Sequence, residues 1–97
     1  MLKKQYRNNR RICAVTFTLP EGIQAKTACV VGDFNAWNPT SHVFRRIKGA
    51  HQVTIDLETG KQYEFRYLVD TGDCFNDDRA DRYVPNPFGT DNSVVEA

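Results

Sequence analysis

The chain's only tryptophan, Trp37, lies in a segment whose other residues are typical of a turn. Residues 32–39 read GDFNAWNP, with Asp33, Asn35 and Asn38 around the indole. Such residues form loops, and loops run over the surface. An exposed indole can stack on the apolar face of a sugar ring while amides beside it bind hydroxyls. It can equally cover the core, buried on one side with its N–H bonded to the loop. The residues alone leave both interpretations open.

Residues that could support catalysis form no recognisable constellation. The chain has no Gly-x-Ser-x-Gly, no phosphate-binding glycine loop, and no histidine near a cysteine in sequence. Cys74 has acidic neighbours, which disfavour a reactive thiolate. Asp77, Asp78 and Asp81 share one segment, whereas a glycosidase needs carboxyls on opposed walls, roughly 5–9.5 Å apart. We therefore expect no catalysis by this chain alone.

Size and cysteine usage limit the class of protein. A chain of 97 residues favours a single domain with one modest core. The odd number of cysteines and their wide spacing argue against a disulfide framework, and the histidines are too scattered for a metal site. No apolar run approaches a membrane span. We expect a cytoplasmic protein without a cofactor.

Charge is unevenly distributed, although the net charge is only +1 and predicts no strong attraction to nucleic acid or membrane. The first residues are basic and the last third is acidic. We expect residues 11–97 to form the domain and residues 1–10 to form a basic arm. A frayed, solvated terminus is the simplest expectation for the arm. Binding of nucleic acid or an acidic partner is the alternative.

Apolar residues alternate with polar ones over most of the chain, which predicts strands that are buried on one face. The clearest alternation places Tyr63, Phe65, Tyr67 and Val69 on one face and Arg66 on the other. Alternating aromatics can bind single-stranded nucleic acid, but the valine on the same face indicates a core. Strands are expected at residues 12–19, 26–31, 43–48, 51–57, 62–70 and 92–96.

No apolar stripe recurs at helical spacing for three turns, and the strands are separated by turn residues. The segment 74–86 is expected to be irregular, with at most one helical turn near Arg79. Pro85 and Pro87 argue against a central strand there. The pattern predicts an all-β, immunoglobulin-like sandwich of about six to eight short antiparallel strands. A small barrel is the alternative.

Three ordered motifs resemble one family. VVGDFNAWNP, YEFRYLVDTG and DRYVPNPFGTDNSVVE resemble the early-set carbohydrate-binding module that precedes the catalytic domain of isoamylases and glycogen branching enzymes. They are similar, too, to the glycogen-binding domain of the AMP-activated kinase β subunit, and most of all to small bacterial proteins consisting of this domain alone. The match runs from about Arg11 to Glu96. It implies an immunoglobulin-like sandwich that binds α-1,4-linked glucan.

The resemblance also implies roles for single residues. Trp37 matches the tryptophan that stacks on a glucose ring, and Arg66 falls where the kinase-type domain has a basic residue. Asn92 matches an asparagine that hydrogen-bonds sugar hydroxyls, with Thr90 beside it. Phe88 takes the place of a leucine that reaches through the sugar helix. The aligned position of a second tryptophan, after one extra turn residue, is Phe75.

The sequence thus predicts non-catalytic binding of glycogen-like or starch-like α-glucan. The carbohydrate-binding residues would be Trp37, Arg66, Phe75, Phe88, Thr90 and Asn92. The alternative is an interaction or structural companion module of a glucan-metabolising enzyme, with little sugar binding of its own.

Overall fold

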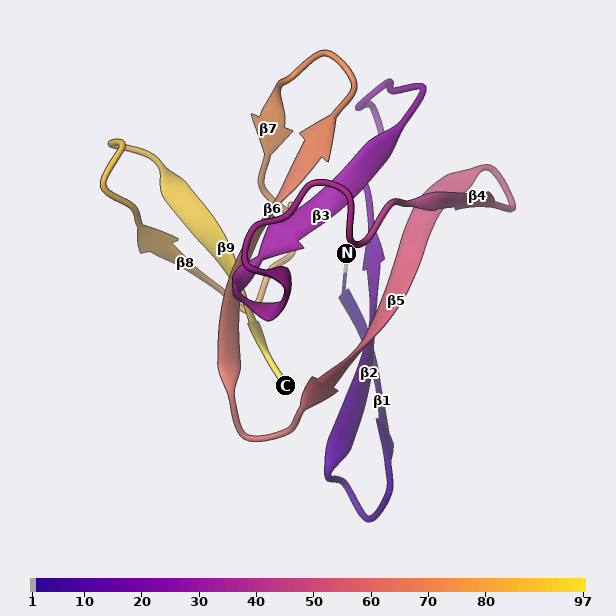
Figure 1. Cartoon of the computed structure of the whole chain (residues 1–97), viewed down its shortest axis with the longest axis vertical. Coiled ribbons are helices and arrows are strands. Elements are labelled where there is room, and N and C mark those ends of the chain that lie inside the picture. The colour runs from indigo at the N-terminus through magenta and orange to yellow at the C-terminus, as the bar shows by residue number, and fades with distance from the viewer. Residues whose placement is uncertain (1) are drawn as a thin grey trace.

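The computed structural model describes residues 2–97, which form two antiparallel β-sheets packed face to face. The four-stranded sheet has the order β1-β2-β5-β4, and the second sheet has the order β3-β6-β9-β8, with β7 also paired to β6. The first sheet consists of β1 (Leu2–Arg7), β2 (Ile12–Thr18), β4 (Arg45–Ile47) and β5 (Ala50–Glu58). The second consists of β3 (Ala28–Gly32), β6 (Gln62–Val69), β7 (Cys74–Phe75), β8 (Arg82–Pro85) and β9 (Asp91–Glu96). The prediction of an all-β sandwich is confirmed (Figure 1).

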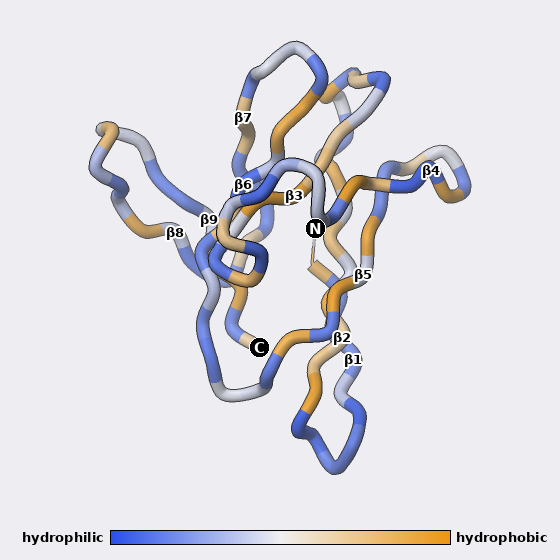
Figure 2. Tube along the Cα trace, viewed as in Figure 1, coloured by the Kyte–Doolittle hydropathy of each residue, from blue (hydrophilic) through white to orange (hydrophobic). Residues whose placement is uncertain are grey.

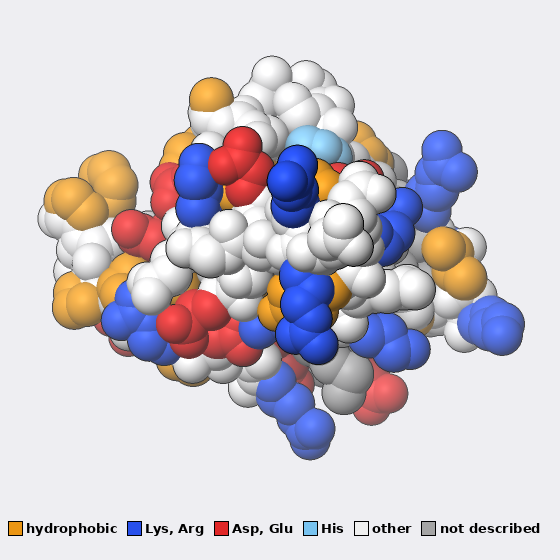
Figure 3. Space-filling model, turned by 90° about the horizontal axis from the view of Figure 1, so that it is seen from below, with side chains coloured by type: hydrophobic (Ala, Val, Ile, Leu, Met, Phe, Trp, Pro, Cys, Tyr) orange, Lys and Arg blue, Asp and Glu red, His pale blue; other side chains and the backbone are white. Residues whose placement is uncertain are grey.

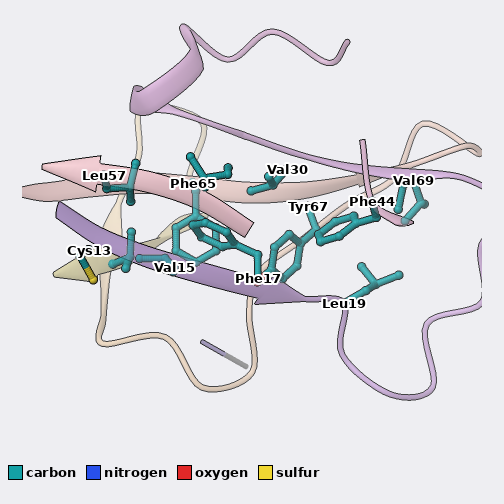
Figure 4. Packing of buried hydrophobic residues seen from close by; sticks show 13 residues of the cluster. Cys13, Val15, Phe17, Leu19, Val30, Phe44, Leu57, Phe65, Tyr67 and Val69 are labelled. Carbon is teal, nitrogen blue, oxygen red and sulfur yellow. The ribbon is translucent and has the colours of Figure 1, made fainter. Parts of the chain in front are cut away.

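The core lies between the sheets, where the residues predicted to face inward meet (Figure 4). Phe17 of β2 contacts Phe65 of β6 edge to face, with ring centroids 5.0 Å apart. Tyr67 makes a similar contact with Phe44, at 5.4 Å. Edge-to-face pairs of this kind add to the stabilisation from apolar burial. The remaining buried members of the core are Cys13, Val15, Leu19, Ala28, Val30, Ile55, Leu57, Val69 and Val95.

The basic N-terminal segment is not frayed, so that expectation is wrong for residues 2–7. They form β1, which pairs with β2 along its whole length from Leu2 opposite Phe17 to Arg7 opposite Ile12. Lys4 also forms an ion pair with Asp81, which lies just before β8 of the other sheet, at 2.7 Å. The hydrophilic turn that follows β1 is at the bottom of Figure 2. Met1 lies outside the described residues.

The segment 74–86 is more regular than expected. It contributes β7 and the edge strand β8, so residues 2–97 contain nine strands in total. Residues 78–79 form a turn and not a helical turn. Pro85 ends β8, which has only β9 as a neighbour. A proline is tolerated there because an edge strand leaves alternate N–H groups unpaired.

Gly32 ends β3 where the backbone of β6 comes closest. A Cβ at this position would lie 2.5 Å from the carbonyl oxygen of Glu64 and 2.8 Å from the Cβ of Phe65. The first is a backbone atom and the second is bonded directly to the backbone, so neither can move unless the strand itself moves. The glycine is therefore required by the close approach of the two strands, and its φ of −175° is ordinary extended backbone.

We expect Gly32→Ala to lower the free energy of unfolding by about 1–3 kcal/mol, as overpacking of a well-packed site does. Urea unfolding followed by tryptophan fluorescence measures the change. Gly72→Ala isolates the other cause of strain: a Cβ there meets nothing within 4 Å, so any loss of stability in that variant comes from its φ of +90° and not from steric overlap. Wild-type stability of Gly32→Ala would contradict the steric argument.

Candidate functional site

The outer face of the second sheet carries the polar residues that the sequence singled out. Along β6, Phe65 and Tyr67 point into the core, so Glu64 and Arg66 point outward. Asn92 of β9 lies on the same side, because its Nδ2 donates to Glu64 Oε1 at 3.1 Å. The pairing of β3 and β9 with β6 therefore gathers residues from distant parts of the chain on one open surface.

Two apolar residues also face outward on this sheet. Val31 is opposite Arg66 in the register and Val94 is opposite Glu64. Both are buried, at 7% and 2% exposure, although neither belongs to the core cluster between the sheets. The outer face therefore has an apolar floor under its polar side chains. Such a floor excludes water from the aliphatic parts of neighbouring long side chains.

Trp37 is held at this surface by the loop that leaves β3. The loop begins with the short 3₁₀ turn η1 (Asp33–Asn35), and Trp37 follows with a left-handed φ of 60°. Its indole Nε1 donates to Asp33 Oδ1 at 3.1 Å, and Asp33 Oδ2 accepts the backbone N–H of Glu64 at 2.9 Å. The carboxylate thus ties the indole to β6. The side chain is 38% exposed and lies outside the core cluster.

Asn35 stabilises the same loop from inside. Its Oδ1 accepts the N–H of Gly32 at 3.1 Å, and its Nδ2 donates to the carbonyl of Val30 at 3.0 Å. Nδ2 also lies 3.0 Å from His42 Nδ1. Phe34, next in the turn, packs on the core at 5.5 Å from the ring of Phe17. Together these contacts leave the position of Trp37 little freedom, because the turn is fixed on both sides.

Arg66 lies half-buried on the outer face with an incomplete set of partners. Its Nε is buried and has no hydrogen-bond partner within residues 2–97. No carboxylate in this part of the chain forms an ion pair with it. A buried donor left unpaired costs about 1–3 kcal/mol. The sequence assigned Arg66 to this face correctly, and the structure adds a polar atom that a ligand could satisfy.

The hairpin between β8 and β9 carries the other expected residues. Asn86 organises it: its Oδ1 accepts the N–H groups of Phe88 and Thr90, and its Nδ2 donates to Thr90 Oγ1 and to Asn92 Oδ1. Gly89 has φ of +82°, a conformation that glycine adopts without strain. Phe88 is 90% exposed at the tip. Hydrophobic side chains gather at the left edge of Figure 3, over this hairpin.

Phe75 does not join the other expected residues. It pairs with Tyr67 across β6–β7 and packs against the core cluster, so it lies on the inner side of the sheet. The outward position of β7 belongs to Cys74, which is exposed and opposite Leu68. The extra residue in the preceding turn explains the difference, because a shift of one residue exchanges the two faces of a strand. Phe75 is therefore left out of the candidate site.

The three cysteines are free thiols in unlike surroundings. Cys13 and Cys29 are buried and Cys74 is exposed. Burial raises the pKa of the Cys29 thiol, and the nearby Cys74 raises it further. Buried, protonated thiols react slowly, because the thiolate is the nucleophile.

We expect a single thiol of the native protein, that of Cys74, to react with an aromatic disulfide reagent at least about tenfold faster than the others. All three should react in guanidinium chloride. The Cys74→Ser variant should lose the fast phase and keep the slow ones. Two fast thiols in the native protein would contradict the burial of Cys13 and Cys29.

Sequence reasoning missed Glu64 and Asn86 as members of this surface. Glu64 accepts from Asn92 and donates its backbone N–H to Asp33, so it joins the two halves of the site. Asn86 joins the hairpin to Asn92. The outward parity of Glu64 was visible in the alternation of β6. The role of Asn86 depends on the folded hairpin and had no signal in the sequence.

The clustered carboxylates have structural partners and do not line this face together. Asp77 is buried and accepts the hydroxyl of Tyr67 and the N–H of Arg79. Asp81 pairs with Lys4 and accepts the N–H of Glu96. What the outer face can do chemically is stack an apolar ring on Trp37 and exchange hydrogen bonds with hydroxyls. Both are properties of a binding surface.

Metal ligands and membrane-spanning helices were the remaining features that could change the class of site, and residues 2–97 contain neither in a recognisable form. No group of three or more histidine, cysteine or acidic side chains in this part of the chain is arranged to hold a metal ion. Nor does any helix within it have the length and apolarity needed to cross a membrane. Compared with known proteins, the chain matches no family model, and no curated protein is found to be similar to it.

Proposed function

We propose that this domain binds linear α-1,4-linked glucan, without catalysis, on the outer face of the sheet β3-β6-β9-β8. Trp37 supplies the stacking platform. Arg66, Asn92 and Thr90 supply hydrogen bonds to hydroxyls, and Phe88 supplies an apolar contact from the hairpin tip. The ligand would be glycogen, starch or a maltooligosaccharide. The free thiols are consistent with the cytoplasmic setting that belongs to this proposal.

The observation that carries the proposal is the placement of Trp37 relative to β6. Its indole is tied through Asp33 to Glu64, two residues from Arg66 on the same outward face. The ring is thus attached to the strand that carries Arg66, and an apolar ring face together with hydroxyl-binding groups is the combination that a glucose unit requires. The three sequence motifs that resemble the early-set carbohydrate-binding module support the same ligand class.

Arg66 gives independent support. Its Nε is buried without a partner within residues 2–97, although Glu64 and Asn92 are hydrogen-bonded to each other on the same face. A sugar hydroxyl accepts as well as donates, so a bound glucan could complete the hydrogen bonding of this guanidinium. The arginine has no alternative explanation as part of a surface ion pair, since none forms in the described chain.

Affinity should be modest, on the order of 0.1–1 mM, because the surface is open and has one well-placed aromatic platform. The placement of Phe75 in the core weakens the case for a second platform. Binding should respond little to salt, because stacking and hydroxyl contacts release no counterions. Nucleic-acid binding by the basic first strand would instead fall steeply as salt rises.

A titration of maltoheptaose into labelled protein, followed by NMR, tests the proposal. Saturable shifts at the Trp37 indole and at the amides of residues 64, 66 and 92 would support it. The absence of shifts at several millimolar sugar would refute it. In that case the same surface is better explained as a docking site for a glucan-metabolising enzyme, the interaction-module alternative.

A further inference from the structure

Glu64 occupies the centre of the outer face and uses only part of its hydrogen-bonding capacity. Within residues 2–97 the one partner of its carboxylate is Asn92 Nδ2, which binds Oε1 at 3.1 Å. An ionised carboxylate accepts about four hydrogen bonds. The second oxygen is therefore available to a ligand, on a side chain that is only partly exposed.

Its position relative to Arg66 is unusual for two opposite charges. The two residues are separated by one position on β6 and point to the same face, about 6.6 Å apart along the strand. Long side chains at that spacing can reach each other, yet they form no ion pair. Each charged group instead keeps free capacity: acceptor lone pairs on Glu64 and an unpartnered donor on Arg66.

The carboxylate is also held in place. Asn92 is fixed from the other side by Asn86 Nδ2, which donates to its Oδ1 at 3.0 Å. The backbone N–H of Glu64 is fixed by Asp33, which also holds the indole of Trp37. Glu64 is thus connected to both ends of the surface by hydrogen bonds. A group held this way loses less side-chain entropy on binding.

A sugar hydroxyl both donates and accepts, and adjacent hydroxyls of a glucose ring need groups of both kinds. A surface made only of arginine and amide donors would leave hydroxyl protons unpaired. We propose that Glu64 is a further sugar-binding residue, whose carboxylate accepts hydrogen bonds from adjacent hydroxyls of the glucose unit to which Arg66 donates. This inference rests on the proposed glucan binding and deepens it.

The test compares variants with β-cyclodextrin and with its analogues deoxygenated at carbon 2 or carbon 3 of each unit. We expect Glu64→Gln to weaken β-cyclodextrin binding about five- to tenfold, and Glu64→Ala at least as much, because a charged acceptor is lost. The glutamine variant still offers Asn92 an acceptor, so a role limited to holding Asn92 predicts near-complete rescue. Urea unfolding verifies that both variants are folded.

The loss of affinity on deoxygenation distinguishes a direct contact between Glu64 and the sugar from a purely structural role of Glu64. The wild type should lose about five- to tenfold in affinity for at least one deoxy analogue, whereas Glu64→Ala should bind that analogue and the parent equally. Glu96→Gln is the matched control: it removes one carboxylate from the same face, where Glu96 pairs with Gln62 at the far end of β9. It should bind like the wild type.

The outcomes separate the two proposals. If the wild type binds neither maltoheptaose nor β-cyclodextrin, the glucan-binding proposal is overturned and the role of Glu64 with it. If the wild type binds and the Glu64 variants bind equally well, only the role of Glu64 is overturned. That role is also overturned if Glu64→Ala remains as sensitive to deoxygenation as the wild type.

Discussion

We expect the substitution Trp37→Ala to abolish detectable binding of maltoheptaose while the domain stays folded. An aromatic ring that stacks on a sugar contributes a large share of a total binding free energy of only about −4 to −5.5 kcal/mol. Losing even about 2 kcal/mol would move the dissociation constant beyond the range that a titration can reach. NMR shifts on the outer face, followed at several millimolar sugar, measure the effect.

Stability should change little in the same variant. The indole is 38% exposed and lies outside the core cluster, so the main loss is its hydrogen bond to Asp33, worth about 1 kcal/mol. The alternative interpretation, in which Trp37 serves to cover the core, predicts unfolding or a loss of several kcal/mol. Thermal unfolding of the unliganded variant distinguishes the two.

Tyr6→Ala is the matched control for the loss of an exposed aromatic. Tyr6 is 44% exposed on β1 of the other sheet, where its ring lies under the guanidinium of Arg10. Its removal deletes an exposed aromatic ring from the sheet that does not contain β6. Unchanged sugar binding in this variant, together with loss in Trp37→Ala, would assign the binding to the outer face. Equal loss in both would contradict that assignment.

The parts of the fold that the sequence predicted well are those where alternation continues through the buried strands. Val15 and Phe17 on β2, and Phe65 and Tyr67 on β6, face the core as the period-two pattern indicated. Each of these strands is long enough for the pattern to exclude a helix. The two-sheet arrangement follows from the number of half-buried strands, because a sheet with one apolar face must bury that face against another sheet.

The parts that were missed depend on partners distant in the sequence. The residues of β1 are mostly charged or polar and contain no apolar alternation, yet the strand forms because the edge of β2 accepts it. β7 has two residues, too few for any pattern. β8 contains a proline that argues against a strand, and only its place at the sheet edge permits one.

In the candidate site, too, residues whose position follows from local alternation were predicted, and residues whose role depends on distant partners were not. Arg66 was placed correctly because its face follows from parity on a long strand. Phe75 was proposed from the resemblance alone, and its position against the core could not be derived from parity, because β7 has only two residues. Glu64 acquires its importance only through Asn92 and Asp33, which come from other parts of the chain. Hydrogen-bond partners of this kind are set by topology and have no local signature.

We expect the largest loss of stability from Asp77→Ala, at about 3 kcal/mol. Asp77 is 1% exposed and lies within the loop that joins β7 to β8. Its carboxylate accepts the hydroxyl of Tyr67 and the backbone N–H of Arg79, while its own N–H donates to Ser93 Oγ at 2.9 Å. Removing the carboxylate leaves the buried hydroxyl of Tyr67 without this acceptor, and an unsatisfied buried group costs about 1–3 kcal/mol beyond the lost contact.

The protonation state of Tyr67 explains why the stability of the domain should depend strongly on the Asp77 carboxylate. Burial raises the pKa of its phenol well above the ordinary value, and the Asp77 carboxylate raises it further. The phenol therefore stays protonated and always needs an acceptor. A domain of this size has a free energy of unfolding of about 5–15 kcal/mol. The variant should lose a substantial part of that, with a fall in Tm of roughly 10–20 °C. Urea and thermal unfolding measure both quantities.

Two comparisons make the prediction specific. Asp78→Ala changes an exposed neighbour of the same charge and should cost less than about 1 kcal/mol. Tyr67→Phe removes the hydroxyl that needs the acceptor. Because the two groups satisfy each other, the Tyr67→Phe/Asp77→Ala double variant should lose clearly less stability than the two single losses added together. Additive losses would show that the Asp77 carboxylate stabilises the loop independently of the Tyr67 hydroxyl, for instance through the backbone N–H of Arg79. The hydroxyl of the buried tyrosine would then have another acceptor.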